Sequence, residues 1–213
     1  MNKRIALFLH QPKCSVQSGN GILKALEPYY QFKIFTKHEV EQDFFDNVDM
    51  IAVPGGIGDA DSYPNLFKHN ELAAKRFVAR GGKYLGICMG AYWAGKHYLN
   101  LLDQIEPVQY ITRPKTDTRR PHAKDIKIKW NGRDTTMFFY DGCALVGPGK
   151  CHVIANYANG DAMAIIQNHI GLIGCHPESE PHWYDEYSWM NGKYHGGMHH
   201  GLLLDFVNDL MKK

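Results

Sequence analysis

A cysteine between two glycines is the group in this sequence best suited to nucleophilic chemistry. Cys88 has Gly86 two residues before it and Gly90 two residues after it, within the stretch YLGICMGA. An apolar run precedes it and a run of small residues follows, which predicts the strand, tight turn and helix of a nucleophile elbow. The positive end of a helix dipole at that turn favours a thiolate. The alternative is a buried structural cysteine beside glycines that merely end a strand.

A histidine and a carboxylate two residues apart supply the groups that would activate this thiol. His176, Pro177 and Glu178 follow an apolar run at 171–175, which predicts that they leave the carboxyl end of a strand, where α/β sites lie. An imidazole can take the proton of a thiol, and a carboxylate can fix the tautomer and orientation of that imidazole. The sequence therefore predicts a Cys88–His176–Glu178 triad, against the alternative of a charged pair in a surface loop.

Backbone amides at two turns are candidates for stabilising a developing oxyanion. Gly55 and Gly56 come directly after an apolar run that ends in Val53 and Pro54. Glycines at such a position expose N–H groups, and the N–H of Met89, directly after the cysteine, is a second source of donors. An ordinary turn at Gly55 and Gly56 is the alternative.

The elements that must position these residues alternate along the first half of the chain. Short apolar runs predict strands and amphipathic or small-residue stretches predict helices. The expected strands lie at 5–9, 32–35, 50–53 and 84–88, and the expected helices at 18–26, 70–79 and 91–95. Repeated units of this size require right-handed crossovers, so we expect an α/β fold with a doubly wound, mostly parallel sheet covered by helices on both faces.

The second half of the chain has a different pattern. Alternation with period two predicts antiparallel strands around 126–130, 136–140 and 152–157, and further strands are expected at 162–167 and 171–175. A final helix is expected at 201–211, where apolar residues share one face. No linker or repeat interrupts the chain, so we expect residues 1–213 to form a single domain.

Composition narrows the classes of function. The 213 residues contain 24 Lys and Arg against 22 Asp and Glu, a net charge of +2, and 44% are hydrophobic. This balance excludes a mainly disordered chain and disfavours a dedicated nucleic-acid binder. The apolar run at 5–9 is too short for a signal peptide, and no run approaches the ~18 residues of a membrane span. Five widely spaced cysteines indicate reduced thiols, so a cytoplasmic location without membrane partners is expected.

The three motifs together resemble those of class I glutamine amidotransferases. They are Pro54–Gly56, Gly86–Gly90 and His176–Glu178, in that order. Within that superfamily the stretch 84–92 looks most like the amidotransferase-like domain at the N-terminus of eukaryotic biotin-protein ligases. The resemblance implies a flavodoxin-like sheet, and it implies Cys88 as nucleophile, His176 as base and Glu178 as its orienting partner. It also implies a thioester intermediate, no cofactor, and a separate synthetase or ligase as partner.

Three functions are compatible with these observations. The first is a Cys-His-Glu amide hydrolase or amidotransferase-like enzyme that acts on a small amide such as glutamine. The second is a non-catalytic binding or regulatory module on the same fold. The third is a peptidase of the related intracellular-protease branch, which is disfavoured because those enzymes usually carry histidine directly after the nucleophile, where this chain has Met89.

Two features outside the triad have open interpretations. Cys14, in the loop after the first strand, would lie near the mouth of the site or be a bystander. The histidine-rich segment at 195–200 would bind a metal or line an aromatic flap with Trp183, Tyr184 and Trp189. It lacks the spacing of known zinc motifs, so no metal ligands are predicted there.

Overall fold

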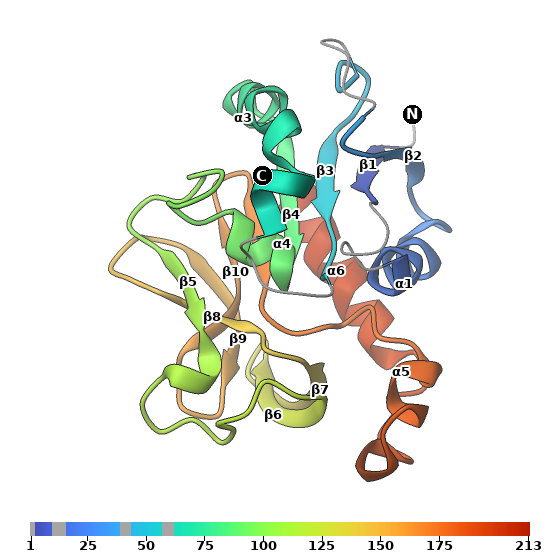
Figure 1. Cartoon of the computed structure of the whole chain (residues 1–213), viewed down its shortest axis with the longest axis vertical. Helices are drawn as coiled ribbons and strands as arrows, with labels where there is room; N and C mark the ends of the chain where they lie inside the picture. Colours follow the sequence, from blue (N-terminus) through green and yellow to red (C-terminus); the bar gives the residue numbers. More distant parts are fainter. Residues whose placement is uncertain (1–2, 10–15, 39–43, 57–61) are drawn as a thin grey trace.

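A mixed sheet runs through the computed structural model, which describes residues 3–9, 16–38, 44–56 and 62–213 (Figure 1). Its parallel strands are hydrogen-bonded in the order β2 (Gln31–Phe35), β1 (Arg4–Phe8), β3 (Met50–Val53), β4 (Lys83–Ile87) and β11 (Ile170–Ile173). This is the order of flavodoxin-like folds, with β11 in the fifth place. The expected parallel, neighbouring strands at 5–9, 50–53 and 84–88 are confirmed, each within one residue of its predicted bounds.

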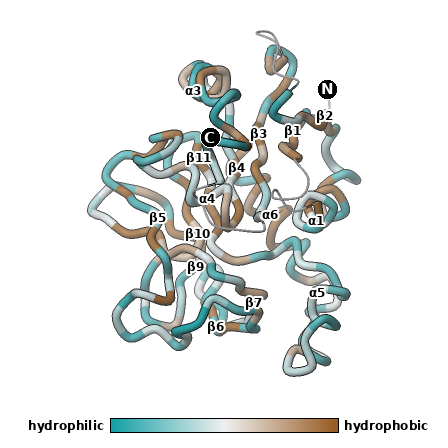
Figure 2. Tube along the Cα trace, in the orientation of Figure 1, coloured by the Kyte–Doolittle hydropathy of each residue, from teal (hydrophilic) through white to brown (hydrophobic). Residues whose placement is uncertain are grey.

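Helices cover both faces of the parallel strands because successive side chains point to opposite sides. In β1, Ile5 and Leu7 join one buried cluster, and Ala6 and Phe8 join another. The first cluster includes residues of α1 (Val16–Leu26) and α6 (Met198–Lys212). The second includes residues of α2 (Tyr63–Leu66), α3 (Glu71–Ala79) and α4 (Met89–Trp93), with the short helix η2 (Lys68–Asn70) between α2 and α3. The predicted doubly wound arrangement is therefore confirmed, and the central strands are apolar along their length (Figure 2).

The later strands extend the sheet in antiparallel fashion, as predicted. From β11 the order continues through β10 (Ala162–Gln167), β9 (His152–Tyr157), β6 (Lys124–Trp130) and β7 (Arg133–Phe139). Two short strands, β5 (Glu106–Gln109) and β8 (Cys143–Val146), pair with each other, and β8 also pairs with β10. The sequence did not predict these two strands, because each has only four residues and shows no clear alternation of apolar and polar side chains. A single turn of 3-10 helix, η3 (Tyr110–Thr112), follows β5.

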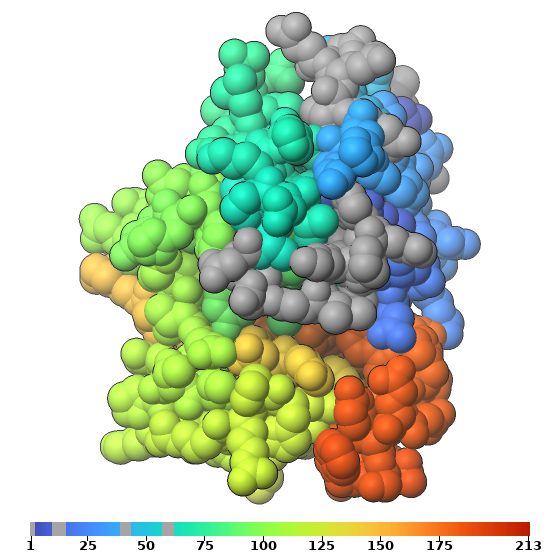
Figure 3. All heavy atoms as spheres, viewed as in Figure 1, coloured from blue at the N-terminus to red at the C-terminus, as the bar shows by residue number. Residues whose placement is uncertain are grey.

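The segment after β11 packs against the antiparallel strands. It holds α5 (Pro181–Asp185) and η4 (Ser188–Met190), and it lies beside the second-half strands in the lower part of Figure 3. A small apolar cluster joins the two parts, namely Ala123, Phe138, Trp183, Tyr184 and Met190. Within the described residues, no helix combines the length and apolar character that a membrane crossing needs.

Candidate active site

Cys88 occupies the predicted elbow between β4 and α4. Its backbone has φ 48° and ψ −104°, a conformation that non-glycine residues rarely adopt and that is typical of functional sites. Its N–H donates to the carbonyl of Ile173 on β11 at 2.8 Å, which extends the β4–β11 pairing to the cysteine. The thiol lies 3.6 Å from the carbonyl of Tyr140 and the residue is 7% exposed. The strained turn thus holds one side chain at the carboxyl edge of the sheet.

The two glycines of the motif are required by close backbone contacts. A Cβ added at Gly86 would lie 2.4 Å from the carbonyl oxygen of Gly90. A Cβ added at Gly90 would lie 2.1 Å from the carbonyl oxygen of Val53, at the end of β3. Both distances are far below van der Waals contact. The steric interpretation of the Gly-x-Cys-x-Gly pattern is therefore confirmed.

His176 follows β11 and is held from several sides. Its N–H donates to the carbonyl of Phe138 at 3.0 Å, and the aromatic rings of Phe138 and Trp183 pack edge-on, with centroids 6.0 and 5.3 Å from the imidazole. The residue is 5% exposed, and its imidazole lies close enough to the Cys88 side chain for the two groups to interact electrostatically. The fold thus brings together a thiol and an imidazole that are far apart in the sequence.

Glu178 completes the predicted series on the other side of the imidazole. Its Oε1 lies 2.8 Å from His176 Nδ1, and its side chain is fully buried. An ionised carboxylate only accepts hydrogen bonds, so Nδ1 carries a proton and Nε2 is the nitrogen left to exchange a proton with the thiol. The turn through Pro177 places the two side chains together, as the sequence predicts.

The surroundings of His176 favour its protonated form. Burial lowers the pKa of His176, but the negative charges of Glu178 and Cys88, and hydrogen bonds with both, raise the pKa to about 10. The imidazole is thereby suited to hold the proton that a thiol gives up. By contrast, burial raises the pKa of the thiols of Cys143, Cys151 and Cys175, which makes them poor nucleophiles near neutral pH.

The predicted oxyanion donors differ in what they already contact. The N–H of Gly55 donates to Ser18 Oγ at 2.9 Å, so this amide has a protein partner. Gly56 directly follows it, and Met89 is the first residue of α4, where N–H groups have no acceptor within the helix. Oxyanion stabilisation by Gly56 and Met89 stays a prediction, and Gly55 has a packing role as well. A Cβ there would lie 2.6 Å from His176 Cε1.

Comparison with known proteins shows which fold the chain has. Residues 12–103 match the family model described as biotin-protein ligase, N terminal. PurLQS from Thermotoga maritima is 14% identical, with a TM-score of 0.68 over 99% of this chain and 100% of its own. A glutamine amidotransferase from the same organism is 12% identical, with a TM-score of 0.68 over 100% of both chains. The chain has a class I glutamine amidotransferase-like fold.

A third structure gives the same result. A glutamine amidotransferase from Methylobacillus flagellatus is 13% identical, with a TM-score of 0.58 over 90% of this chain and 76% of its own. No curated protein matches the chain.

The histidine-rich segment of this amidotransferase-like chain is tied to the turn that carries Glu178. Nε2 of His195 lies 3.1 Å from the carbonyl oxygen of Ser179, and its Nδ1 accepts the N–H of His199 at 3.2 Å. Nε2 of His200 lies 3.1 Å from Oε1 of Glu180, whose other oxygen pairs with Lys24 of α1. Over the described ranges, no group of three or more His, Cys, Asp or Glu could hold a metal ion. The segment is therefore hydrogen-bonded to the turn that carries Glu178. Cys14 lies outside the described residues.

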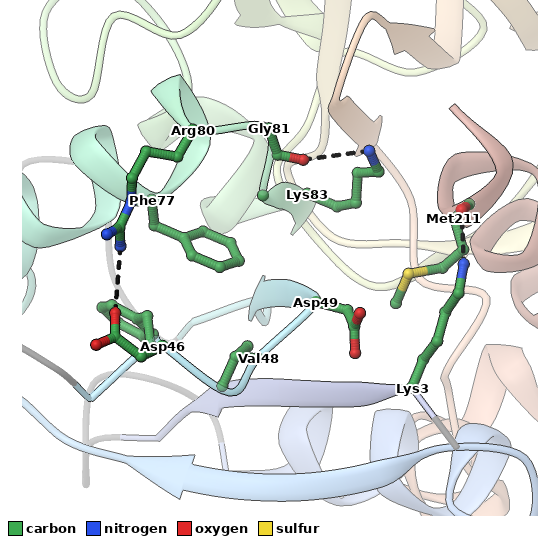
Figure 4. Close-up of a pocket in the computed structure, with 11 residues that line it drawn as sticks. Lys3, Asp46, Val48, Asp49, Phe77, Arg80, Gly81, Lys83 and Met211 are labelled. Carbon is green, nitrogen blue, oxygen red and sulfur yellow. Dashed lines mark hydrogen bonds and ion pairs between the residues drawn. The ribbon is translucent and has the colours of Figure 1, made fainter. Parts of the chain in front are cut away.

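A separate cavity lies at the opposite edge of the amidotransferase-like fold. It has a volume of about 400 Å³ and lies where β1, β3 and β4 begin, whereas Cys88 follows the end of β4 (Figure 4). Its charged side chains already have partners: Lys3 Nζ donates to the carbonyl of Met211 at 2.7 Å, and Arg80 lies 3.5 Å from Asp46. Its lining does not include Cys88, His176 or Glu178.

Proposed function

We propose that this chain is a Cys-His-Glu amide hydrolase of the glutamine amidotransferase type, acting on a small amide such as glutamine. The observation that supports it best is the buried His176–Glu178 pair, 2.8 Å apart, beside a cysteine that sits in a strained elbow at the carboxyl edge of the sheet. A nucleophile, a base and a group that orients the base are the parts that covalent amide hydrolysis needs.

The first half of the reaction forms a thioester. The thiolate of Cys88 attacks the amide carbon, and the C=O electron pair moves to the oxygen. N–H groups of Gly56 and Met89 would face this oxyanion, since the N–H of Gly55 is bonded to Ser18. His176 then gives its proton to the amide nitrogen, the C–N bond breaks, and ammonia leaves.

The second half returns the enzyme to its starting state. Water gives a proton to the neutral His176 and attacks the thioester carbon, and the C–S bond breaks as the thiolate leaves. Glu178 keeps Nδ1 protonated throughout, so that Nε2 faces the reacting atoms in both halves. The products are a carboxylic acid and ammonia. We expect a separate synthetase or ligase to consume that ammonia.

Ammonia release is the direct test. The wild-type chain is incubated with glutamine, asparagine and other small primary amides, and ammonia is measured with Cys88→Ala and Cys151→Ser alongside. Cys151 is a partly exposed cysteine outside the triad and serves as the matched control. Release that requires Cys88 but not Cys151 supports the proposal, and equal release from wild type and Cys88→Ala refutes it.

A binding or regulatory module is the second candidate, and the burial of the nucleophile favours it. Cys88 is only 7% exposed and its thiol contacts the carbonyl of Tyr140. This candidate predicts that an amide or its acid binds with a measurable heat but is not hydrolysed. Calorimetry on the Cys88→Ala variant, compared with turnover by wild type, separates the two functions.

A further inference from the structure

Ser18 joins three segments of the site through one hydroxyl group. It lies in the first turn of α1, is completely buried, and places Oγ 2.6 Å from Oε1 of Glu178, a residue 160 positions later. The same Oγ accepts the N–H of Gly55 at 2.9 Å. The hydroxyl therefore connects α1, the turn after β3 and the turn after β11.

The direction of each hydrogen bond around Ser18 follows from its partners. The N–H of Gly55 can only donate, so Ser18 Oγ accepts there, and the single hydroxyl proton goes to Glu178. Oε1 of Glu178 thus receives one proton donor from Ser18 and another from Nδ1 of His176. With its acceptor role set from both sides, this oxygen fixes the tautomer of the imidazole.

Close packing keeps α1 at the distance that this contact needs. Gly21 lies one turn after Ser18, on the same side of the helix, and a Cβ added there would lie 2.1 Å from the carbonyl oxygen of Glu178. The helix thus touches both the backbone and the side chain of the residue that orients the base. Ser18 cannot withdraw from the carboxylate unless the helix moves.

We propose that Ser18 is a positioning residue of the triad, which holds the Glu178 carboxylate against His176 and ties it to the turn at Gly55. The proposal rests on the proposed function, because it gives Ser18 a role in activating Cys88. Ser18 is bonded to Glu178 and Gly55 and acts on the thiol through His176. Among the residues that the structure describes, the charged and titratable groups that interact with the imidazole are Glu178 and Cys88, while Phe138 and Trp183 contribute aromatic rings.

The test is the pH profile of Cys88 alkylation, which needs no substrate. Iodoacetamide labelling of the full chain is followed between pH 5 and 9 by mass spectrometry, for wild type, Ser18→Ala and Ser18→Thr. Loss of a hydrogen bond to a charged carboxylate weakens its hold on the imidazolium, so the acid limb should move to higher pH by about 0.5–1 unit in Ser18→Ala. Ser18→Thr keeps the hydroxyl and should return the profile toward that of wild type.

The matched control removes a hydrogen bond of similar length from a residue that follows α1. Tyr30 donates to Oδ1 of Asn208 at 2.6 Å, just after α1, so Tyr30→Phe loosens that segment without touching Glu178. Its labelling profile should match that of wild type. An unmoved profile in Ser18→Ala, or an equal shift in Tyr30→Phe, would overturn the role of Ser18 alone. A wild-type Cys88 that labels like an ordinary thiol would overturn the triad as well.

Discussion

Replacing Gly90 by alanine tests whether the elbow requires a glycine for steric reasons. The added Cβ would lie 2.1 Å from the carbonyl oxygen of Val53, a backbone atom at the end of β3 that cannot rotate away. Relief requires α4 and β3 to separate by about 1 Å in a region where both are buried. Overpacking of this kind costs on the order of 1–3 kcal/mol. For a chain of this length that corresponds to a fall in melting temperature of roughly 2–12 °C.

The matched control is Gly201→Ala in α6. Gly201 is exposed and helical, and apart from its chain neighbours and the backbone of its own helix no atom lies within 4 Å of a Cβ added there. Alanine should therefore stabilise this helix by about 0.5–1 kcal/mol, because glycine is the weaker helix former. The free energy of unfolding of each variant is measured by urea titration. The comparison with wild type holds when the dependence of that free energy on urea concentration is the same in both proteins.

The alkylation rate of Cys88 in the native state provides a second measurement on Gly90→Ala. A displaced elbow should lower this rate, whereas Gly201→Ala should leave it at the wild-type value. A Gly90→Ala variant as stable and as reactive as wild type would show that β3 and α4 do not approach as closely as the structure has them, and the steric argument for the motif would fail.

Two further predictions concern titratable groups. Cys88 should be alkylated by iodoacetamide at pH ~6 faster than Cys143, Cys151 or Cys175, because burial raises the pKa of those three thiols; faster labelling of any of them contradicts the triad. Burial, with repulsion from His195 and His200, lowers the pKa of His199 to about 3, so its contribution to stability is complete above pH ~6.5 and is lost as the pH falls toward 3. Wild type should thus lose more unfolding free energy between pH 7 and 4.5 than His199→Gln, measured in urea; equal losses would show that this imidazole is not held neutral.

The amino-acid sequence by itself determined the parts of the site that depend on neighbours in the chain. The Gly-x-Cys-x-Gly pattern specifies the elbow, since a tight strand-to-helix turn has no room for side chains two residues on either side of Cys88. The two-residue spacing of His176 and Glu178 is enough to bring their side chains together in one turn. Short continuous runs of apolar residues likewise predicted the central parallel strands. A strand that is buried on both faces of the sheet carries apolar side chains at successive positions.

Only the tertiary structure decided the contacts between distant segments. Ser18 carries no motif, yet it reaches Glu178 because Gly21 lets α1 lie directly on the turn after β11. The same packing gives the N–H of Gly55 a hydroxyl partner, which local spacing did not predict. The sequence left the segment at 195–200 open to a metal or a flap, and the structure adds contacts from this segment to Ser179 and Glu180. Such contacts join residues up to 160 positions apart, and they arise from how helices settle on the sheet, which local pattern and propensity do not encode.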